Sequence, residues 1–479
     1  MSSTVDTRSD EEDRMYASEK EDNFRWVAKW VATTSMRVLS KEDRVDERVD
    51  DAVSALAEFA EIAHGSMDPA WILNPQNRKI LGRKDFPLAD YKALGLRKDG
   101  ELRENIILVD SFKGNIGNLQ GYTALRMSQT ATRLRGSRST SRIIKPQLIL
   151  AFSGTSNLIH GIYNLMTVPV QYQPVSNTES HHDWRVHDGF QRVYQSIREP
   201  AIRALYLAIK KMEEAHNGDW DLVITGHSLG TAVASLFLLD LMRSEDALDE
   251  PGTSSAADAE MPILPSSTKV TIAKFGPPRV VNPGLVVEYH KQVQQFRRRR
   301  GDDALIDWAI IGHMDGVPAV PPMKFGYAHL CRKPFYLYHG KLYRIQEGEH
   351  EHSLFTVDDV SSPPLHPKGG HNYYGARDME RLQRRMKALM VDVMAEGTNS
   401  YQGQPAQLGA SWNSATSSRG VGGASNIRAP GSQQNDPLWV RAYLEREKEE
   451  ECAWATRPPE TGRSHWGLLR SILPIMRFS

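Results

Sequence analysis

The stretch Leu222–Gly230 (LVITGHSLG) joins an apolar run to the pentapeptide Gly-x-Ser-x-Gly, and a run of small and apolar residues follows it. This order predicts a strand, a sharp turn at Ser228 and a helix. Gly226 and Gly230 leave room for such a turn, because neither carries a side chain that would meet the helix or the strand. The helix N-terminus lies beside the serine, where it stabilises a developing anion. We therefore predict that Ser228 is a nucleophile.

Similar apolar runs occur before and after this stretch, and they alternate with helical patterns. Strands alternating with helices favour a mainly parallel sheet with helices on both faces, which is the α/β class. The predicted strands cover residues 147–154, 220–228 and 269–276, and the predicted helices cover residues 198–216 and 229–242.

The composition excludes several classes of partner and compartment. Lys plus Arg and Asp plus Glu are equal at 59 each, so no net field attracts nucleic acid. The chain has two cysteines, Cys331 and Cys452, which are too few and too far apart in the sequence for a disulfide framework. We therefore predict free thiols in a reducing compartment. The first residues are polar and acidic, unlike a secretory signal, and no apolar run is long enough to span a membrane. These features predict an intracellular, cytoplasmic protein.

The chain divides by composition into four predicted parts. Residues 1–23 form a disordered acidic tail, 24–396 a hydrolase-like domain with an N-terminal helical extension, 397–436 a flexible Gly/Ser-rich linker, and 437–479 a helical, amphipathic tail. Within the extension, residues 50–64 predict an alanine-rich helix.

Two segments allow two interpretations each. Residues 24–39 place apolar side chains near one helical face without any acid, which fits either a helix on a membrane surface or a helix packed on the domain. Residues 466–478 are apolar with two arginines, which fits either an anchor on a membrane or lipid droplet or a segment docked on the domain.

A serine nucleophile needs a general base and an acid that orients the base, and the usual order in α/β enzymes is serine, acid, histidine. Asp315 follows an apolar strand in a Gly/Pro loop, where such an acid belongs. Asp302, Asp303 and Asp307 are disfavoured because they lie in a charged, surface-like stretch beside the basic run 297–300, which we interpret as a solvated face.

Several histidines follow Asp315, and the pattern alone leaves the choice of base open. His371 is favoured because it lies in a glycine loop before a long amphipathic helical pattern. His350 and His352 lie in a charged stretch that predicts an exposed loop, and their spacing does not predict a metal site. The remaining candidates are His329, His339 and His366.

At this point the sequence resembles the fungal class 3 lipase family, the group of the Rhizomucor-type triacylglycerol lipases. The resemblance covers residues 147–389 and rests on ordered motifs besides GHSLG. These motifs are LAFSGT (150–155), TVPVQYQPV (167–175), VHDGF (186–190), FGPPRVVNP (275–283) and DGVPAVPP (315–322).

The resemblance implies an α/β-hydrolase fold and a catalytic triad of Ser228, Asp315 and His371, with Tyr374 three residues after the histidine. It also implies an oxyanion hole formed by Thr155 and Leu229. The activity expected is hydrolysis of acylglycerol ester bonds through an acyl-enzyme, with no metal or cofactor. The alternatives are a phospholipase or another carboxylesterase of the feruloyl esterase kind, and a non-catalytic lipid-binding or scaffold protein on the same fold.

Residues 156–166 align with the amphipathic lid helix of these lipases. Its apolar face predicts a cover over an acyl trench that opens on lipid, although a buried connector is the alternative. An uncharged lid favours long-chain acyl esters, so the expected partner is a lipid ester. The predicted lid residues are Leu158, Ile159, Ile162, Leu165 and Met166.

The chain departs from the family pattern at three positions outside the triad. Ser153 stands where the family usually has Arg, Val281 where it has Gly, and Gly370 where it has Asp. The differences are expected to affect the anchoring of the lid and the support of His371.

Overall fold

The computed structural model describes part of the chain, and all of the described residues belong to one compact unit, residues 20–386. The second unit, residues 1–19 and 387–479, lies outside the described residues, as does the predicted lid. The division into four parts therefore stays a prediction. The described residues are 24–64, 68–74, 106–116, 119–127, 129–131, 142–154, 169–172, 183–247, 261–338, 340–346, 348–359, 369–375 and 377–379.

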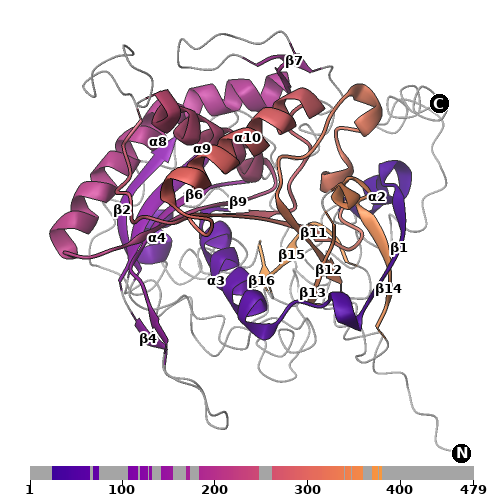
Figure 1. Cartoon of the computed structure of the whole chain (residues 1–479), viewed down its shortest axis with the longest axis horizontal. Helices are drawn as coiled ribbons and strands as arrows, with labels where there is room; N and C mark the ends of the chain where they lie inside the picture. The colour runs from indigo at the N-terminus through magenta and orange to yellow at the C-terminus, as the bar shows by residue number, and fades with distance from the viewer. Residues whose placement is uncertain are drawn as a thin grey trace, which may run out of the picture. The chain divides into compact units, whose positions relative to one another are not determined.

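An eight-stranded sheet forms the centre of this unit, in the order β13-β12-β11-β10-β9-β6-β3-β2 (Figure 1). The five strands from β12 to β6 in this order are parallel, and the remaining pairings are antiparallel. The α/β class and the mainly parallel sheet are therefore confirmed. The strands are β2 Ile106–Lys113, β3 Gln120–Arg126, β6 Gln147–Phe152, β9 Asp221–His227, β10 Val270–Phe275, β11 Leu305–Gly312, β12 Lys333–Tyr338 and β13 Lys341–Arg344.

Helices cover both faces of the sheet, as predicted. In Figure 1, α8 (Asp188–Ala215), α9 (Leu229–Ala247) and α10 (Pro283–Arg300) lie on one face, and α3 (Glu47–Ala63) lies on the other. Local signals fix where they begin: the Asp46 side chain accepts a hydrogen bond from Val49 N at the start of α3, and Asn282 caps α10 in the same way.

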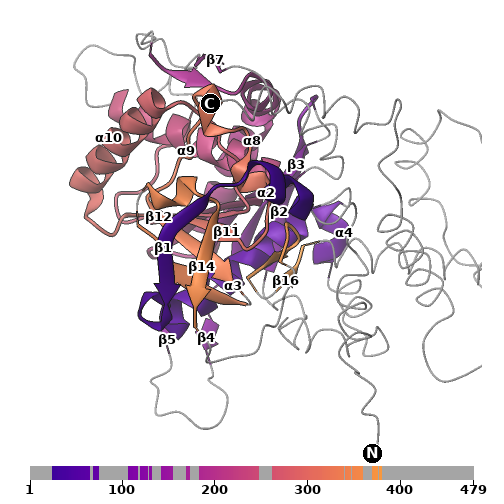
Figure 2. The same cartoon turned by 90° about the vertical axis from the view of Figure 1, so that its right-hand side faces the viewer.

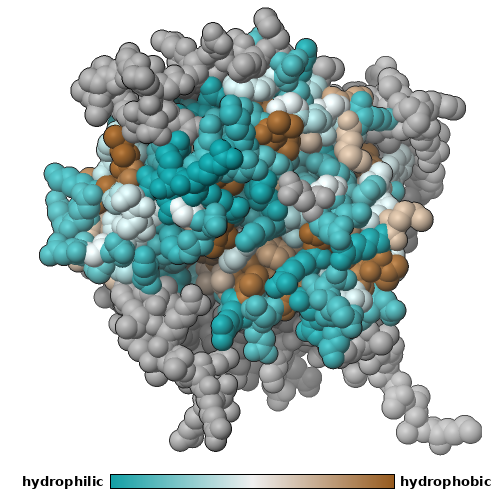
Figure 3. Space-filling model, viewed as in Figure 1, coloured by the Kyte–Doolittle hydropathy of each residue, from teal (hydrophilic) through white to brown (hydrophobic). Residues whose placement is uncertain are grey.

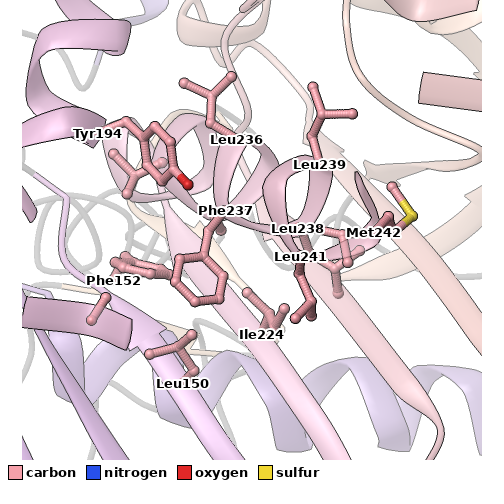
Figure 4. Packing of buried hydrophobic residues seen from close by; sticks show 14 of the residues in the cluster. Leu150, Phe152, Tyr194, Ile224, Leu236, Phe237, Leu238, Leu239, Leu241 and Met242 are labelled. Carbon is pink, nitrogen blue, oxygen red and sulfur yellow. The ribbon is translucent and has the colours of Figure 1, made fainter. Parts of the chain in front are cut away.

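The core between α9 and the sheet is closely packed (Figure 4). Phe237 of α9 lies against Phe152 of β6, with ring centroids 5.7 Å apart, and both side chains are fully buried. Leu150 and Ile224, from β6 and β9, are fully buried in the same cluster. Burial of each such side chain contributes about 1.5–3 kcal/mol, so this packing holds α9 firmly on β9.

The prediction of one helix over residues 24–39 is wrong for its second half. Helix α2 covers only Arg25–Val31, and Thr34–Ser40 forms strand β1, which pairs in parallel with β14 (Leu354–Asp358; Figure 2). Apolar spacing alone does not reveal a pairing partner more than 300 residues away, and that pairing overrides the helical pattern. Helix α2 is packed on the domain: a Cβ placed on Gly316 would lie 2.4 Å from Val27 Cβ.

Shorter elements connect these parts. They are helix α4 (Pro69–Leu73), the strand pairs β4 (Gln129–Ala131) with β5 (Arg142–Ile144), β7 (Val170–Gln171) with β8 (Arg185–Val186) and β15 (Tyr373–Tyr374) with β16 (Arg377–Asp378), and the 3-10 turns η2 (Lys41–Asp43), η4 (Val317–Ala319), η5 (Met323–Phe325) and η6 (Glu349–Glu351).

The described surface is mixed in polarity. Figure 3 shows hydrophobic residues on this face as separate patches among polar ones. None of the helices within the described ranges has the length and apolar character needed to cross a membrane.

Candidate active site

Ser228 occupies the predicted turn between a strand and a helix. Strand β9 ends at His227, α9 begins at Leu229, and Ser228 has a φ of 56°, in the left-handed region. A non-glycine residue there is strained and persists only where its surroundings hold it. Ser228 N donates to Phe275 O at 2.9 Å, and the Thr231 hydroxyl donates to Ser228 O at 2.6 Å.

The two glycines of the pentapeptide have no space for a side chain. A Cβ on Gly230 would lie 2.4 Å from Phe152 O, and a Cβ on Gly226 would lie 2.6 Å from the carbonyl carbon of Gly230. The obstructing atoms belong to the backbone and cannot move aside easily. The sharp turn at Ser228 therefore depends on glycine at both positions.

Asp315 and His371 come together from distant parts of the chain. His371 Nδ1 and Asp315 Oδ2 are 2.8 Å apart, and both side chains are fully buried. Val317 N donates to the other carboxylate oxygen at 2.8 Å, and the Tyr374 hydroxyl donates to Oδ2. The acid is thus fixed on both oxygens, and it can orient an imidazole and stabilise its protonated form.

These groups lie beside Ser228. Ser228 N bonds to the carbonyl of Phe275, and a Cβ on the next residue, Gly276, would lie 2.9 Å from both His371 Cε1 and Asp315 Oδ2. Ser228 Oγ and His371 Nε2 are buried, and neither has a hydrogen-bond partner among the described residues. They are the two atoms between which a serine-histidine mechanism moves a proton.

Burial sets the charge of two neighbours of the site. It raises the pKa of Tyr374 well above the ordinary value, and the adjacent Asp315 carboxylate raises this pKa further. Tyr374 therefore stays protonated and remains a donor. Burial also lowers the pKa of His227 well below its ordinary value, with further contributions from His371 and His64, so this imidazole is neutral.

The predicted oxyanion-hole residues are only partly described. Leu229 is the first residue of α9, so its N–H has no acceptor within the helix. Thr155 lies outside the described residues, as do the five predicted lid residues, Leu158, Ile159, Ile162, Leu165 and Met166.

The hairpin that follows His371 is attached to α3, a contact that the sequence did not predict. Arg377 Nη1 lies 2.9 Å from Glu61 Oε2, and Arg377 Nη2 lies 3.0 Å from Glu58 Oε2. The Ser54 hydroxyl donates to Gly375 O at 2.7 Å. Charged residues more than 300 positions apart gave no local signal of this pairing.

The glycines before His371 explain one departure from the family pattern. Gly369 and Gly370 have φ values of 66° and 123°, and Gly370 N donates to His313 O at 2.8 Å. An aspartate would be strained at such an angle. The backbone bond to His313 supports the His371 loop instead.

Two charged residues predicted at the surface have side chains that are almost fully removed from solvent. Asp307 lies inside β11, where its carboxylate is 2.6 Å from Lys274 Nζ and accepts from the Tyr289 hydroxyl at 2.8 Å. Arg300 Nη2 lies 2.7 Å from Glu245 Oε1, and both side chains are less than a tenth exposed. The partners of these two residues come from other elements, so the charged stretch around each residue did not reveal them.

The prediction of an exposed loop at His350 is also wrong. His350 is buried, and its Nδ1 accepts from Gly348 N at 3.1 Å. Ligand atoms of His329, His350 and Glu351 lie within 4.8 Å of one another. However, Glu351 Oε2 already lies 2.6 Å from Arg279 Nε and 3.0 Å from His329 Nδ1. A buried guanidinium repels a metal cation, so this cluster fits an ion-pair network.

Two of the other described candidates for acid and base have partners away from the site. Asp303 pairs with Lys269 at the surface, and His352 Nδ1 lies 3.2 Å from the Thr33 hydroxyl. His339 and His366 lie outside the described residues.

In comparisons with known proteins, residues 149–325 match the model of the Lipase (class 3) family. The order of strand, serine turn, helix, acid and histidine is that of α/β hydrolases, as predicted.

Individual relatives match part of the chain. Over 182 residues the chain is 28% identical to a lipase of Rhizomucor miehei, covering 38% of this chain and 39% of the relative. It is 26% identical to a lipase of Rhizopus oryzae over the same length, covering 38% and 36%. The chain thus spans about two fifths of the length of these relatives. The solved structure of lipase II from Rhizopus niveus gives a TM-score of 0.39 at 15% identity, over 71% of this chain and 98% of that one.

Proposed function

We propose that this protein is a serine hydrolase that cleaves the carboxylic ester bonds of acylglycerols. Ser228 is the nucleophile, His371 the general base and Asp315 the acid that orients it. The observation that carries the proposal is the 2.8 Å bond between His371 and Asp315, both buried beside a serine in a left-handed turn. The match of residues 149–325 to the class 3 lipase family supports the choice of lipid esters.

In the proposed reaction, Ser228 Oγ attacks the carbonyl carbon of the ester while His371 Nε2 accepts the hydroxyl proton. The resulting oxyanion collapses, the bond to the alcohol oxygen breaks, and His371 returns the proton to the leaving alcohol. Water then attacks the acyl-enzyme with the same histidine as base, which releases the fatty acid and restores Ser228. Asp315 stabilises the imidazolium in both steps.

The oxyanion is bound by Leu229 N–H and by Thr155 in this proposal. The support for Leu229 is its place at the start of α9, where backbone donors point out of the helix. The support for Thr155, and for a lid at residues 156–166, is the resemblance of their sequence to that of the family. Ile162→Asp should then weaken hydrolysis of emulsified long-chain esters much more than that of a dissolved short-chain ester. Equal loss on both would show that the segment is structural.

The chemistry is tested with a fluorophosphonate probe and a panel of acylglycerols, phospholipids and feruloyl esters. The wild type should react with the probe and prefer acylglycerols. Ser228→Ala should neither react with the probe nor hydrolyse any of the esters, and it should unfold at the same temperature as the wild type. Preference for phospholipids or feruloyl esters would establish one of the other esterase activities. A folded wild type without any labelling would establish a non-catalytic protein.

We also propose a cytoplasmic location, either free or on a membrane or lipid-droplet surface. The support is the sparse use of cysteine, with two residues in the chain, of which Cys331 is buried. By contrast, a relative from Malassezia globosa is called a secreted mono- and diacylglycerol lipase, and it is 26% identical over 222 residues, which cover 44% of this chain and 59% of the relative. Fractionation of cells and medium distinguishes the two locations, and recovery from the medium would overturn ours.

A further inference from the structure

A second pair of histidines lies behind the proposed triad. His227 Nε2 is 2.8 Å from the main-chain oxygen of His371, and the two imidazole rings lie 4.3 Å apart. On its other side, His227 Nδ1 is 3.3 Å from His64 Nδ1. His64 follows the last residue of α3 and is buried. A chain of contacts thus runs from α3 through His227 to the residue proposed as the base.

The direction of each hydrogen bond follows from the chemistry of the groups. A carbonyl oxygen can only accept, so Nε2 of His227 carries the hydrogen in the bond to His371 O. Because burial keeps His227 neutral, its Nδ1 then bears a lone pair and accepts. The donor to this atom is the Nδ1–H of His64. His64 therefore selects the tautomer in which His227 can hold the His371 backbone.

His64 also contacts the turn that leads to the proposed oxyanion hole. A Cβ on Gly154, the residue before Thr155, would lie 2.8 Å from His64 Nδ1 and 3.1 Å from His227 O. The ring therefore fills the space between the end of β6 and the end of β9. Residue 64 precedes the family match at 149–325, so this part of the site belongs to the N-terminal extension.

We propose that His64 is a positioning residue for His371, acting by fixing the tautomer of His227. The inference rests on the proposed function of His371 as general base. Without the donor at His64, His227 can move its hydrogen to Nδ1 and lose the bond to the His371 backbone. The imidazole would then be placed less accurately beside Ser228, and misplacement of a catalytic group by about 1 Å can lower the rate about 100-fold.

Two nearly isosteric variants test this role in the full chain. His64→Leu removes the donor, whereas His64→Asn keeps an N–H donor near the position of Nδ1. We expect His64→Leu to lower kcat by about 10- to 100-fold with KM changed less than about twofold, and to slow fluorophosphonate labelling in parallel. His64→Asn should stay within about threefold of the wild type. Equal kcat for folded His64→Leu and wild type would overturn the proposal, as would equal losses in the two variants.

The ¹⁵N chemical shifts of the histidine rings test the tautomer without relying on activity. In the wild type, His227, assigned by comparison with His227→Gln, should be protonated at Nε2 only. A hydrogen on Nδ1 of His227 would overturn the proposal even if the His64 variants failed to fold. The absence of Ser228-dependent hydrolysis in the wild type would instead refute the proposed function, so the two failures are distinguishable.

Discussion

Arg377→Met should strongly destabilise the protein, because it removes the cation that Glu58 and Glu61 share. The guanidinium lies 2.9 and 3.0 Å from the two carboxylates, and the three side chains are exposed by 5%, 0% and 0%. Methionine keeps much of the apolar stem but leaves two carboxylates buried on α3 without this cation. Breaking a buried ion pair in this way costs about 3–5 kcal/mol in the free energy of unfolding.

Urea unfolding of the full chain measures this cost. Arg192→Met is the matched control, since Arg192 pairs with Asp188 one helical turn away on the surface and should contribute less than about 0.5 kcal/mol. Adding Glu58→Gln and Glu61→Gln to Arg377→Met should recover part of the loss, because the buried charges are then gone. If Arg377→Met were no more destabilising than Arg192→Met, our view that α3 holds the His371 hairpin through this ion pair would be wrong.

Three further predictions concern the site and the core. His371→Ala should lower ester hydrolysis by at least about 1,000-fold in a folded protein. His329→Ala should instead lower stability and leave the folded enzyme active. The reverse result in initial-rate assays would place the base at His329. Gly230→Ala should cost about 1–3 kcal/mol or more through contact with Phe152 O. This cost should exceed that of Gly326→Ala, where the added methyl group has open space, although Gly326, unlike Gly230, has a positive φ. Thermal melting compares the two variants, and equal costs would contradict the contact. Burial, together with nearby His329, lowers the pKa of His350 from 6.5 to about 3. The unfolded chain therefore binds more protons than the native state between these values, and stability falls as the pH falls. His350→Gln should flatten this dependence in urea titrations, and an unchanged slope would contradict it.

The sequence predicted those parts of the molecule that depend on local pattern. Residues 222–230 contain both the apolar run of the strand and the two glycines that the turn requires, so the position of Ser228 could be predicted from nearby residues. The apolar runs around 147–154 and 269–276 likewise predicted β6 and β10. The sheet class followed from their alternation with helices.

The sequence predicted less where a residue's role depends on a distant partner. The segment at 34–40 became a strand because β14 lies beside it, and Asp307 is buried because Lys274 and Tyr289 meet it inside the sheet. His64 follows an alanine-rich helix and belongs to no recognised motif. Its proposed positioning role is therefore indicated by the structure, through the 3.3 Å contact with His227, and not by the sequence. Long-range pairing of polar groups leaves no period in the sequence.

Covalent labelling of Ser228 tests the central proposal most directly. The full chain is treated with a fluorophosphonate, digested, and analysed by mass spectrometry, with Ser228→Ala and His371→Ala as controls of matched stability. We predict one adduct on the peptide that contains Ser228, no adduct on it in Ser228→Ala, and labelling slowed by at least about 1,000-fold in His371→Ala. An unlabelled Ser228 in a folded wild type, or labelling that is equally fast without His371, would contradict the proposed triad.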